Sequence, residues 1–329
     1  MSVLEAKPEE YVCRSALPSG PEELVITARK VWLGKTTLVA RALPDRDIRM
    51  IGAWCFLDHY GPEDVRDSPG MQVYAHPHTG LQTVSWLIEG EIEHRDSLGT
   101  QALVSPGTLN IMTAGHGIVH SEISQSDKPP TLHGLQLWVA LPDAVRDQPP
   151  RFDRYVDLPR LDRPGVSGRV LVGEVDGVGS SAISFSPLVG ADLTLDPGAE
   201  VELAVDPDHE HGVFVIAGEL IGGAGAIART DQLVYLGSGR DRLGLTAGAE
   251  GVRMLLLGGE PFVEEIVMWW NFIGRSHDKI ASFRQLWEHR DTDAGTGRFP
   301  PVIDRGERVM EAPAMPTVPL KARPRRQRR

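Results

Sequence analysis

Two short segments, well separated in the chain, each place two potential metal ligands one residue apart. The first segment contains His76 and His78, and the second contains His120 and Glu122. Residues i and i+2 of a β-strand point to the same face, so two such strands can bring all four side chains together inside one β-barrel. Three imidazoles and one carboxylate suit a divalent first-row metal such as iron, nickel, copper or zinc. The spacing therefore predicts a metal site between two neighbouring strands.

The rest of the chain favours many short strands over long helices. It holds 35 glycines and 25 prolines, and turns such as Pro106-Gly107 separate runs rich in β-branched and aromatic residues. This pattern is typical of β-barrels and jelly rolls. We expect two strand-rich blocks joined by a proline-rich, charged connector. The predicted boundaries are an extension over 1–24, a metal-binding domain over 25–145, a linker over 146–165, a second domain over 166–303 and a basic Pro/Arg-rich tail over 304–329.

The pattern becomes helical after Pro261. Apolar residues recur at three- and four-residue spacing over 262–270 and over 278–288, which predicts two short helices. Trp269 and Trp270 are interpreted as core or interface residues. Farther on, glycine, proline and charge dominate, so we expect the tail to be disordered.

The charge balance argues against a nucleic-acid-binding protein. The net charge is −11, but residues 321–329 carry six basic residues and no acidic one, so the remainder carries −17. An acidic body repels nucleic acid, and only the basic tail has the charge to contact it. The chain also lacks a phosphate-binding loop, a dinucleotide fingerprint and a nucleophile elbow.

Nothing in the sequence predicts a membrane span or a secretory signal. A span needs a run of about 18 apolar residues, which is absent, and the first residues lack the basic-then-apolar order of a signal peptide. We therefore expect a cytoplasmic protein. In a reducing compartment Cys13 and Cys55 are expected to be free thiols.

A second histidine pair, His209 and His211, lies in the second strand-rich block. The run Gly251-Val-Arg-Met-Leu-Leu-Leu-Gly258, which should supply complementary ligands, contains no histidine or carboxylate. This favours a vestigial site. The solitary His59 and His94 are interpreted as neighbours of the metal ligands, pocket residues or surface histidines rather than as ligands.

The segments around the candidate ligands resemble the pirin family of the cupin superfamily, over roughly residues 25–300. The motifs that carry the resemblance fall in family order: Phe56-Leu-Asp-His-Tyr-Gly-Pro62, His76-Pro-His-Thr-Gly80, Glu89-Gly-Glu-Ile-Glu-His-Arg-Asp-Ser-Leu-Gly99, Met112-Thr-Ala-Gly-His-Gly-Ile-Val-His-Ser-Glu122 and Leu135-Gln-Leu-Trp-Val-Ala-Leu-Pro142. The resemblance implies a mainly β protein made of two cupin β-barrels (a bicupin of the jelly-roll type) with short C-terminal helices.

The same resemblance implies one metal in the N-terminal barrel, held by His76, His78, His120 and Glu122. It implies Fe(II), with nickel, copper, manganese or zinc as alternatives. Many family members carry glutamate at the position of Gln82, so this residue is expected to be a neutral hydrogen-bonding neighbour of the pocket. His116 is expected at the pocket mouth, where an imidazole would titrate near neutral pH.

Two functional hypotheses remain open. The first is an Fe(II) dioxygenase that acts with O₂ on a quercetin-like flavonol or another phenolic substrate, with Glu122 as ligand and candidate catalytic base. The second is a non-catalytic, iron-binding regulator that senses redox state and binds a protein partner. An enzyme needs an open metal position and room for an aromatic substrate, whereas a sensor needs only a surface that responds to oxidation.

Overall fold

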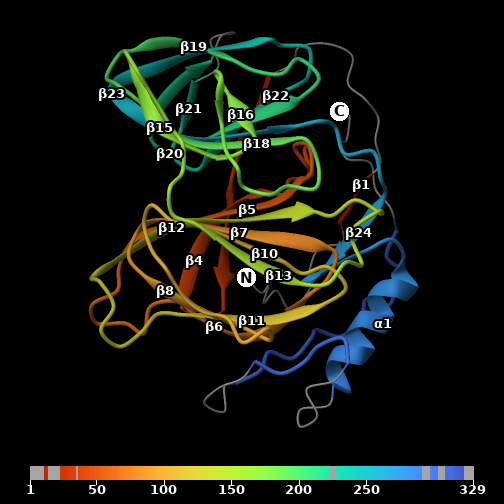
Figure 1. The fold of residues 1–329 in the computed structure, drawn as a ribbon. Coiled ribbons are helices and arrows are strands. Elements are labelled where there is room, and N and C mark those ends of the chain that lie inside the picture. The colour runs from red at the N-terminus through yellow and green to blue at the C-terminus, as the bar shows by residue number, and fades with distance from the viewer. Residues whose placement is uncertain are drawn as a thin grey trace.

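The structure is a computed structural model that describes residues 11–13, 23–34, 36–222, 227–290, 297–302 and 308–321. Nearly all regular structure in these residues is β-strand, arranged in two stacked lobes with a single helix beside the first lobe (Figure 1). This confirms the predicted mainly β, two-barrel fold. The described strands form separate sheets rather than continuous closed ladders.

The first lobe packs a seven-stranded antiparallel sheet against a four-stranded one. The larger sheet has the order β13-β10-β7-β12-β5-β4-β3 and the smaller has the order β6-β11-β8-β9. Their strands are β3 (Arg29–Leu33), β4 (Thr37–Leu43), β5 (Trp54–Asp64), β6 (Gln72–His78), β7 (Leu81–Glu89), β8 (Ile92–Asp96), β9 (Gln101–Val104), β10 (Leu109–Thr113), β11 (Ile118–Ile123), β12 (Thr131–Ala140) and β13 (Arg151–Tyr155).

The second lobe is built on a nine-stranded sheet with the main order β14-β15-β18-β23-β20-β22-β2. Two further strands pair with the ends of the long strands, β19 with β23 and β21 with β20, and β16 and β17 form a small hairpin. The strands are β2 (Glu23–Thr27), β14 (Arg160–Arg163), β15 (Val166–Val172), β16 (Glu174–Val175), β17 (Val178–Gly179), β18 (Leu188–Leu195), β19 (Glu200–Ala204), β20 (Glu210–Gly222), β21 (Ile227–Arg229), β22 (Gln232–Leu236) and β23 (Arg242–Gly259).

The two lobes exchange segments at both ends of the described chain. Strand β2 pairs with β22 of the second lobe, and the chain then enters the first lobe at β3. Toward the C-terminus the chain returns to the first lobe, where β24 (Ile266–Trp269), β25 (Phe272–Gly274) and α1 (His277–Glu288) pack beside it (Figure 1). The segment predicted as a linker supplies β13 to the first lobe and β14 to the second.

The prediction of a helix over 262–270 is wrong. Residues Ile266–Trp269 form β24, which pairs with β1 (Tyr11–Cys13) and with β25 across a turn where Trp270 has φ +53°. A short, fully buried apolar run does not reveal its period, because every side chain is apolar whichever backbone it adopts. The second predicted helix is confirmed as α1, whose N-cap Ser276 accepts a hydrogen bond from the Lys279 N–H.

The prediction that the tail is disordered is wrong for residues 308–321. Met310, Ala312 and Leu320 are buried against the first lobe and α1. The Trp287 indole N–H donates to the Met310 carbonyl at 2.9 Å. Composition missed this docking because only a few apolar residues, spaced among prolines, supply the contact. Most of the basic stretch, residues 322–329, lies outside the described residues.

Side-chain alternation along β7 divides the first lobe into an interior and an interface. Ser85 points into the lobe and donates to Glu122, whereas its neighbour Trp86 points to the second lobe and donates to Asp192. Buried apolar residues of the larger sheet, including Leu57 and Leu137, share one core with second-lobe residues such as Phe214. The larger sheet therefore has one face toward the candidate metal site and the other toward the second lobe.

Candidate metal centre

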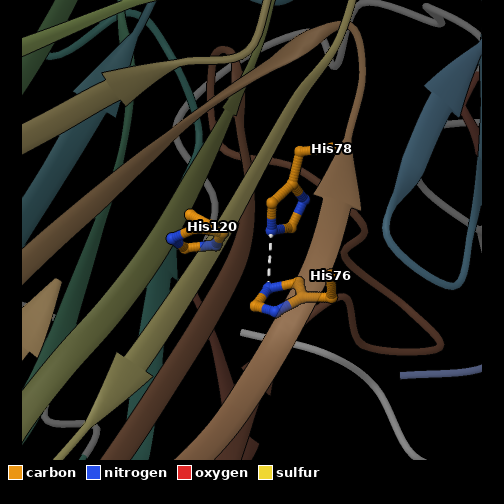
Figure 2. Close-up of side chains that lie close together, drawn as sticks. All are labelled: His76, His78 and His120. Atoms are coloured by element: carbon orange, nitrogen blue, oxygen red, sulfur yellow. Dashed lines mark hydrogen bonds between the residues drawn. The ribbon is translucent and has the colours of Figure 1, made fainter. Parts of the chain in front are cut away.

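Three histidines from adjacent strands lie together inside the first lobe. His76 and His78 stand on β6 and His120 on β11, where His120 is directly paired with His76 (Figure 2). One ring nitrogen from each lies within 4.8 Å of the others, and all three side chains are buried. The spacing of one residue thus places both β6 histidines on the inner face, as predicted.

Hydrogen bonds to backbone carbonyls orient the two β6 histidines. The Nδ1 of His76 lies 2.8 Å from the Tyr74 carbonyl oxygen, and the Nδ1 of His78 lies 3.0 Å from the Asn271 carbonyl oxygen. A carbonyl only accepts, so each Nδ1 carries the proton and each neutral ring presents a bare Nε2 lone pair. These two Nε2 atoms face one another at 3.1 Å, an approach that a cation between them would stabilise (Figure 2).

A chain of side chains fixes His120 in the same tautomer. Asp96 accepts from the His94 Nε2 at 3.2 Å, which leaves the Nδ1 of a neutral His94 as an acceptor. The His120 Nδ1 lies 3.4 Å from it and can donate. The His120 Nε2 is buried and has no hydrogen-bond partner in the described structure. Carboxylate–histidine chains of this kind orient metal-binding imidazoles.

Burial keeps all three rings in the form that binds metals. It lowers the pKa of His76, His78 and His120 well below the usual 6.5, and the neighbouring histidines add to the effect at His78 and His120. The rings are therefore neutral at pH 7 and each offers a lone pair. Three neutral imidazoles with a ring nitrogen each within 4.8 Å of the others fit a divalent metal such as iron, nickel, copper or zinc.

The spacing predicts that Glu122 joins His76, His78 and His120, but the structure places it on the other side of His120. Its carboxylate groups with His94 and His120 rather than with the two β6 histidines. The pairing of β11 with β6 shifts register between His120 and Glu122, so Glu122 is opposite Val73. A bulge at this point changes the direction in which the Glu122 side chain points. Glu122 accepts a hydrogen bond from Ser85 Oγ at 3.2 Å.

A row of polar side chains crosses the larger sheet at the level of Glu122. Pairing of directly opposite residues runs from β10 through β7, β12 and β5 to β4, and the row consists of Asn110, Ser85, Gln136, Asp58 and Arg41. All five are buried. Asp58 holds Arg41 through two hydrogen bonds of 2.7 and 2.8 Å, and Ser85 contacts Gln136 at 2.9 Å.

Several polar atoms of this interior have no protein partner in the described structure. They are both amide atoms of Asn110, the Gln136 Nε2 and the Trp138 Nε1. Buried polar atoms are nearly always hydrogen-bonded, so these positions call for water or a polar ligand. The row is therefore suited to a bound molecule that carries hydroxyl or carbonyl groups.

Aromatic rings line the interior next to the polar row. Trp138 packs against His78 edge to face and stacks on Phe56 at a centroid distance of 4.1 Å. Tyr60 lies close enough to Glu122 for that carboxylate to contribute, after burial, to raising the pKa of its hydroxyl well above 10. Tyr60 therefore stays protonated and can donate a hydrogen bond within the site.

The structure places two of the predicted pocket residues, Gln82 and His59, on the face of the sheet opposite the histidine cluster. Gln82 lies on the interface face of β7, where its amide donates to Thr113 and to the Ile183 carbonyl. His59 also faces the second lobe, and its Nε2 lies 2.8 Å from that of His133. In both cases strand alternation places the side chain opposite the metal site. His116, in the turn before β11, contacts Gln148 and Arg298, and burial lowers its pKa.

The structure places His94 next to His120, and sequence reasoning missed the polar row and Tyr60. Alternation offered a signal for Ser85, because it lies three residues from Gln82 and so on the opposite face. The sequence could not show that Asn110 and Gln136 lie in one row with Ser85 between them, because this depends on the order of the strands in the sheet.

The second-lobe pair does not form a comparable cluster among the described residues. His211 is buried with no hydrogen-bond partner for either ring nitrogen, and burial lowers its pKa to about 4. The His209 and His211 rings lie 6.1 Å apart, and no third ligand joins them. The vestigial interpretation stays a prediction. In the described part of the chain, no helix is long and apolar enough to cross a membrane.

Comparisons with known proteins agree with the fold. The pirin family model matches residues 36–139, and the model of the pirin C-terminal cupin domain matches residues 190–293. A Pseudomonas aeruginosa protein named "Putative quercetin 2,3-dioxygenase PA1205" is 46% identical over 270 residues, which are 82% of this chain and 85% of the relative. A pirin-like protein of Caulobacter vibrioides is 34% identical over 294 residues, 87% of this chain and 97% of the relative.

A solved structure extends the agreement to three dimensions. The crystal structure of a quercetin 2,3-dioxygenase from Acinetobacter baumannii has a TM-score of 0.85 and 38% identity, and the match covers 91% of this chain and 98% of that one. Sequence, architecture and the buried histidine cluster point the same way. The chain therefore belongs to the pirin family.

Proposed function

We propose that this protein is a metal-dependent dioxygenase that acts on a quercetin-like flavonol or a related phenolic substrate. The proposed metal is Fe(II), held by His76, His78, His120 and Glu122. The observation that carries the proposal is the set of three buried imidazoles, each with a ring nitrogen within 4.8 Å of the others, in which the His76 and His78 Nε2 atoms face one another and the His120 Nε2 has no hydrogen-bond partner in the described structure. The relatives named as quercetin 2,3-dioxygenases support the substrate class.

A metal bound there would supply Lewis-acid and O₂ chemistry, and the protein's own groups would prepare the substrate. Glu122 is the acceptor for the proton of the substrate hydroxyl, because it is the carboxylate next to the histidine cluster. Ser85 donates to one Glu122 oxygen and so holds the carboxylate in place. The Tyr60 hydroxyl, kept protonated, offers a donor to an oxygen of the substrate.

The polar row and the rings together fit a hydroxylated aromatic molecule. Asn110 and Gln136 offer amide groups that can bond to hydroxyl and carbonyl oxygens, and Trp138 offers an apolar ring face. Burial of the histidines excludes bulk water from the centre. Exclusion of water strengthens the electrostatic interactions of the bound substrate.

The test combines metal analysis with oxygen uptake. Full-length protein purified without added metal should contain close to one metal ion per chain, and it should consume O₂ with at least one member of a flavonol panel. The double variant His76→Ala/His78→Ala should lose both the metal and the activity. His211→Ala, a buried second-lobe histidine, is the matched control and should keep them.

Two outcomes would contradict the proposal. Near-stoichiometric metal in the His76→Ala/His78→Ala variant would place the site elsewhere. Metal bound by the parent without oxygen uptake on any flavonol, together with a surface that changes when iron is oxidised, would favour the regulator hypothesis. The full burial of His76, His78 and His120 favours this alternative, because a redox sensor does not need a substrate to reach the metal.

A further inference from the structure

A second candidate site lies between the lobes, away from the histidines. A cleft of about 340 Å³ separates the end of β7 and the β9–β10 turn from the outer face of β14, β15, β18 and β23. This volume is within the range of small-molecule sites. Trp86 in its wall points away from the lobe interior that holds Ser85 and Glu122, so the cleft and the metal centre lie on opposite faces of the same sheet.

The wall of this cleft is rich in arginine, in a chain whose net charge is −11. Arg160, Arg169 and Arg253 line it, and Asp192 is the one carboxylate among its lining residues. Ser167 and Thr194 add hydroxyl groups. The wall therefore presents mainly hydrogen-bond donors, which suits an anion.

Both carboxylate oxygens of Asp192 already accept hydrogen bonds from protein groups. It accepts from Arg253 at 3.0 and 2.6 Å and from the Trp86 indole N–H at 2.8 Å. These bonds fix the Arg253 guanidinium in a single orientation at the cleft. A rigid, pre-oriented guanidinium loses little freedom when it binds a ligand.

Arg169 is placed between a like charge and this occupied carboxylate. It is directly opposite Arg160 on β14 and directly opposite Asp192 on β18. Like charges at directly opposed positions of a sheet destabilise it. Arg160 is hydrogen-bonded to Asp162, but no hydrogen bond to Arg169 is present in the described structure, although Asp162 lies close enough to interact with it electrostatically. An anion bound in the cleft would give the Arg169 guanidinium a hydrogen-bond acceptor and an opposite charge.

We propose that this interlobe cleft binds a small organic carboxylate. Arg169 and Arg253 pair with the carboxylate group, Ser167 and Thr194 lie within the same wall, and the apolar body of the ligand packs on Ile88. Two carboxylates at the margin of the cleft would repel a ligand with more than one negative charge. Asp162 pairs with Arg160, and Glu89 interacts electrostatically with Arg253. The site therefore favours a monoanion with an apolar part.

The experiment uses the full-length, metal-loaded protein and benzoate as the probe. Binding is measured by calorimetry and by the ¹⁵N-indole resonance of Trp86, which Trp86→Phe identifies by its loss. Benzoate should shift that resonance, and Arg169→Gln should weaken benzoate at least about tenfold, because a charge-assisted bidentate pair is lost. Arg229→Gln removes one exposed arginine from the same lobe and controls for net charge.

Benzamide and inorganic phosphate test the chemical class. Benzamide has the shape of benzoate without its charge, and phosphate has charge without the apolar body, so both should bind more weakly than benzoate. An unshifted Trp86 resonance at saturating benzoate would overturn the proposal. An equal loss of affinity in Arg169→Gln and Arg229→Gln would also overturn it, and so would equal binding of benzamide.

Discussion

At the scale of single residues, the capacity of the candidate metal centre to bind a metal depends on which ring nitrogen of each histidine carries a proton. His76 and His78 are held by backbone carbonyls, whereas His120 is held through His94 and Asp96. In each case the outer hydrogen bond leaves Nε2 bare toward the centre. The sequence gives no direct sign of these partners, because a carbonyl acceptor can belong to any residue type.

Glu122→Gln separates the two roles proposed for this residue. The change keeps the size and an oxygen atom but removes the negative charge and the basicity. If Glu122 is both ligand and base, the variant should retain part of its metal and lose flavonol turnover per bound metal by about 10²–10⁴-fold. Oxygen uptake normalised to metal content measures this. Activity per metal within roughly tenfold of the parent would leave Glu122 as a ligand only.

The interlobe histidine pair gives a pH dependence of stability. Burial, together with the nearby His59, lowers the pKa of His133 to about 4. In the unfolded chain the same ring titrates near 6.5, so between these values the unfolded state binds more protons. Stability should therefore be full above about pH 6.5 and should fall as the pH drops from there to about 4.

Urea denaturation of the metal-loaded protein at a series of pH values checks this expectation. His133→Gln removes the titrating ring at the interface, so its stability should change less over the same pH range. Parallel curves for the parent and His133→Gln would show that another group causes the loss.

At the scale of elements, sequence patterns predicted strands and the helix α1 well where the hydrophobic period was clear. They failed at β24, where Ile266, Val267, Met268 and Trp269 are all apolar and buried, so no period was visible. They failed again in residues 308–321, where docking rests on isolated residues. The strand positions of the metal histidines were predictable, but the bulge that re-aims Glu122 was not, because it depends on the pairing of β6 with β11.

The docked segment should contribute to stability through a few side chains. Leu320 is buried and its backbone N–H donates to the His277 ring, so Leu320→Ala should lower the free energy of unfolding by about 2–4 kcal/mol. Val318, two residues earlier, is 61% exposed, and Val318→Ala should change it by less than about 0.5 kcal/mol. Chemical denaturation of both variants compares them. Equal, small effects would show that the segment is not docked in solution.

At the scale of the whole molecule, the two lobes share a core and exchange strands. Residues of the first lobe such as Leu57 pack in one cluster with Phe214 and Leu255 of the second. Trp54 donates to the carbonyls of Val189 and Gly258 across the interface. Separate unfolding of either lobe would expose this shared surface to water.

We therefore expect one cooperative unfolding transition rather than two. Urea denaturation of the metal-free protein, monitored by tryptophan fluorescence and by far-ultraviolet circular dichroism, should give coincident curves with one midpoint. Ile26→Ala, which weakens the β2 contact with the shared core, should move both curves together. A plateau between two transitions would show that the lobes unfold independently.

The exchange of segments also bears on the order in which the protein matures during synthesis. Strand β2 leaves the ribosome early, yet its partner β22 is translated long afterwards. His78 is held by the carbonyl of Asn271, so the last contact that orients the histidine cluster waits until most of the chain has been translated. A nascent chain that ends before Asn271 has both β6 histidines but not this contact. Insertion of the metal in its final geometry is therefore expected to follow synthesis rather than accompany it.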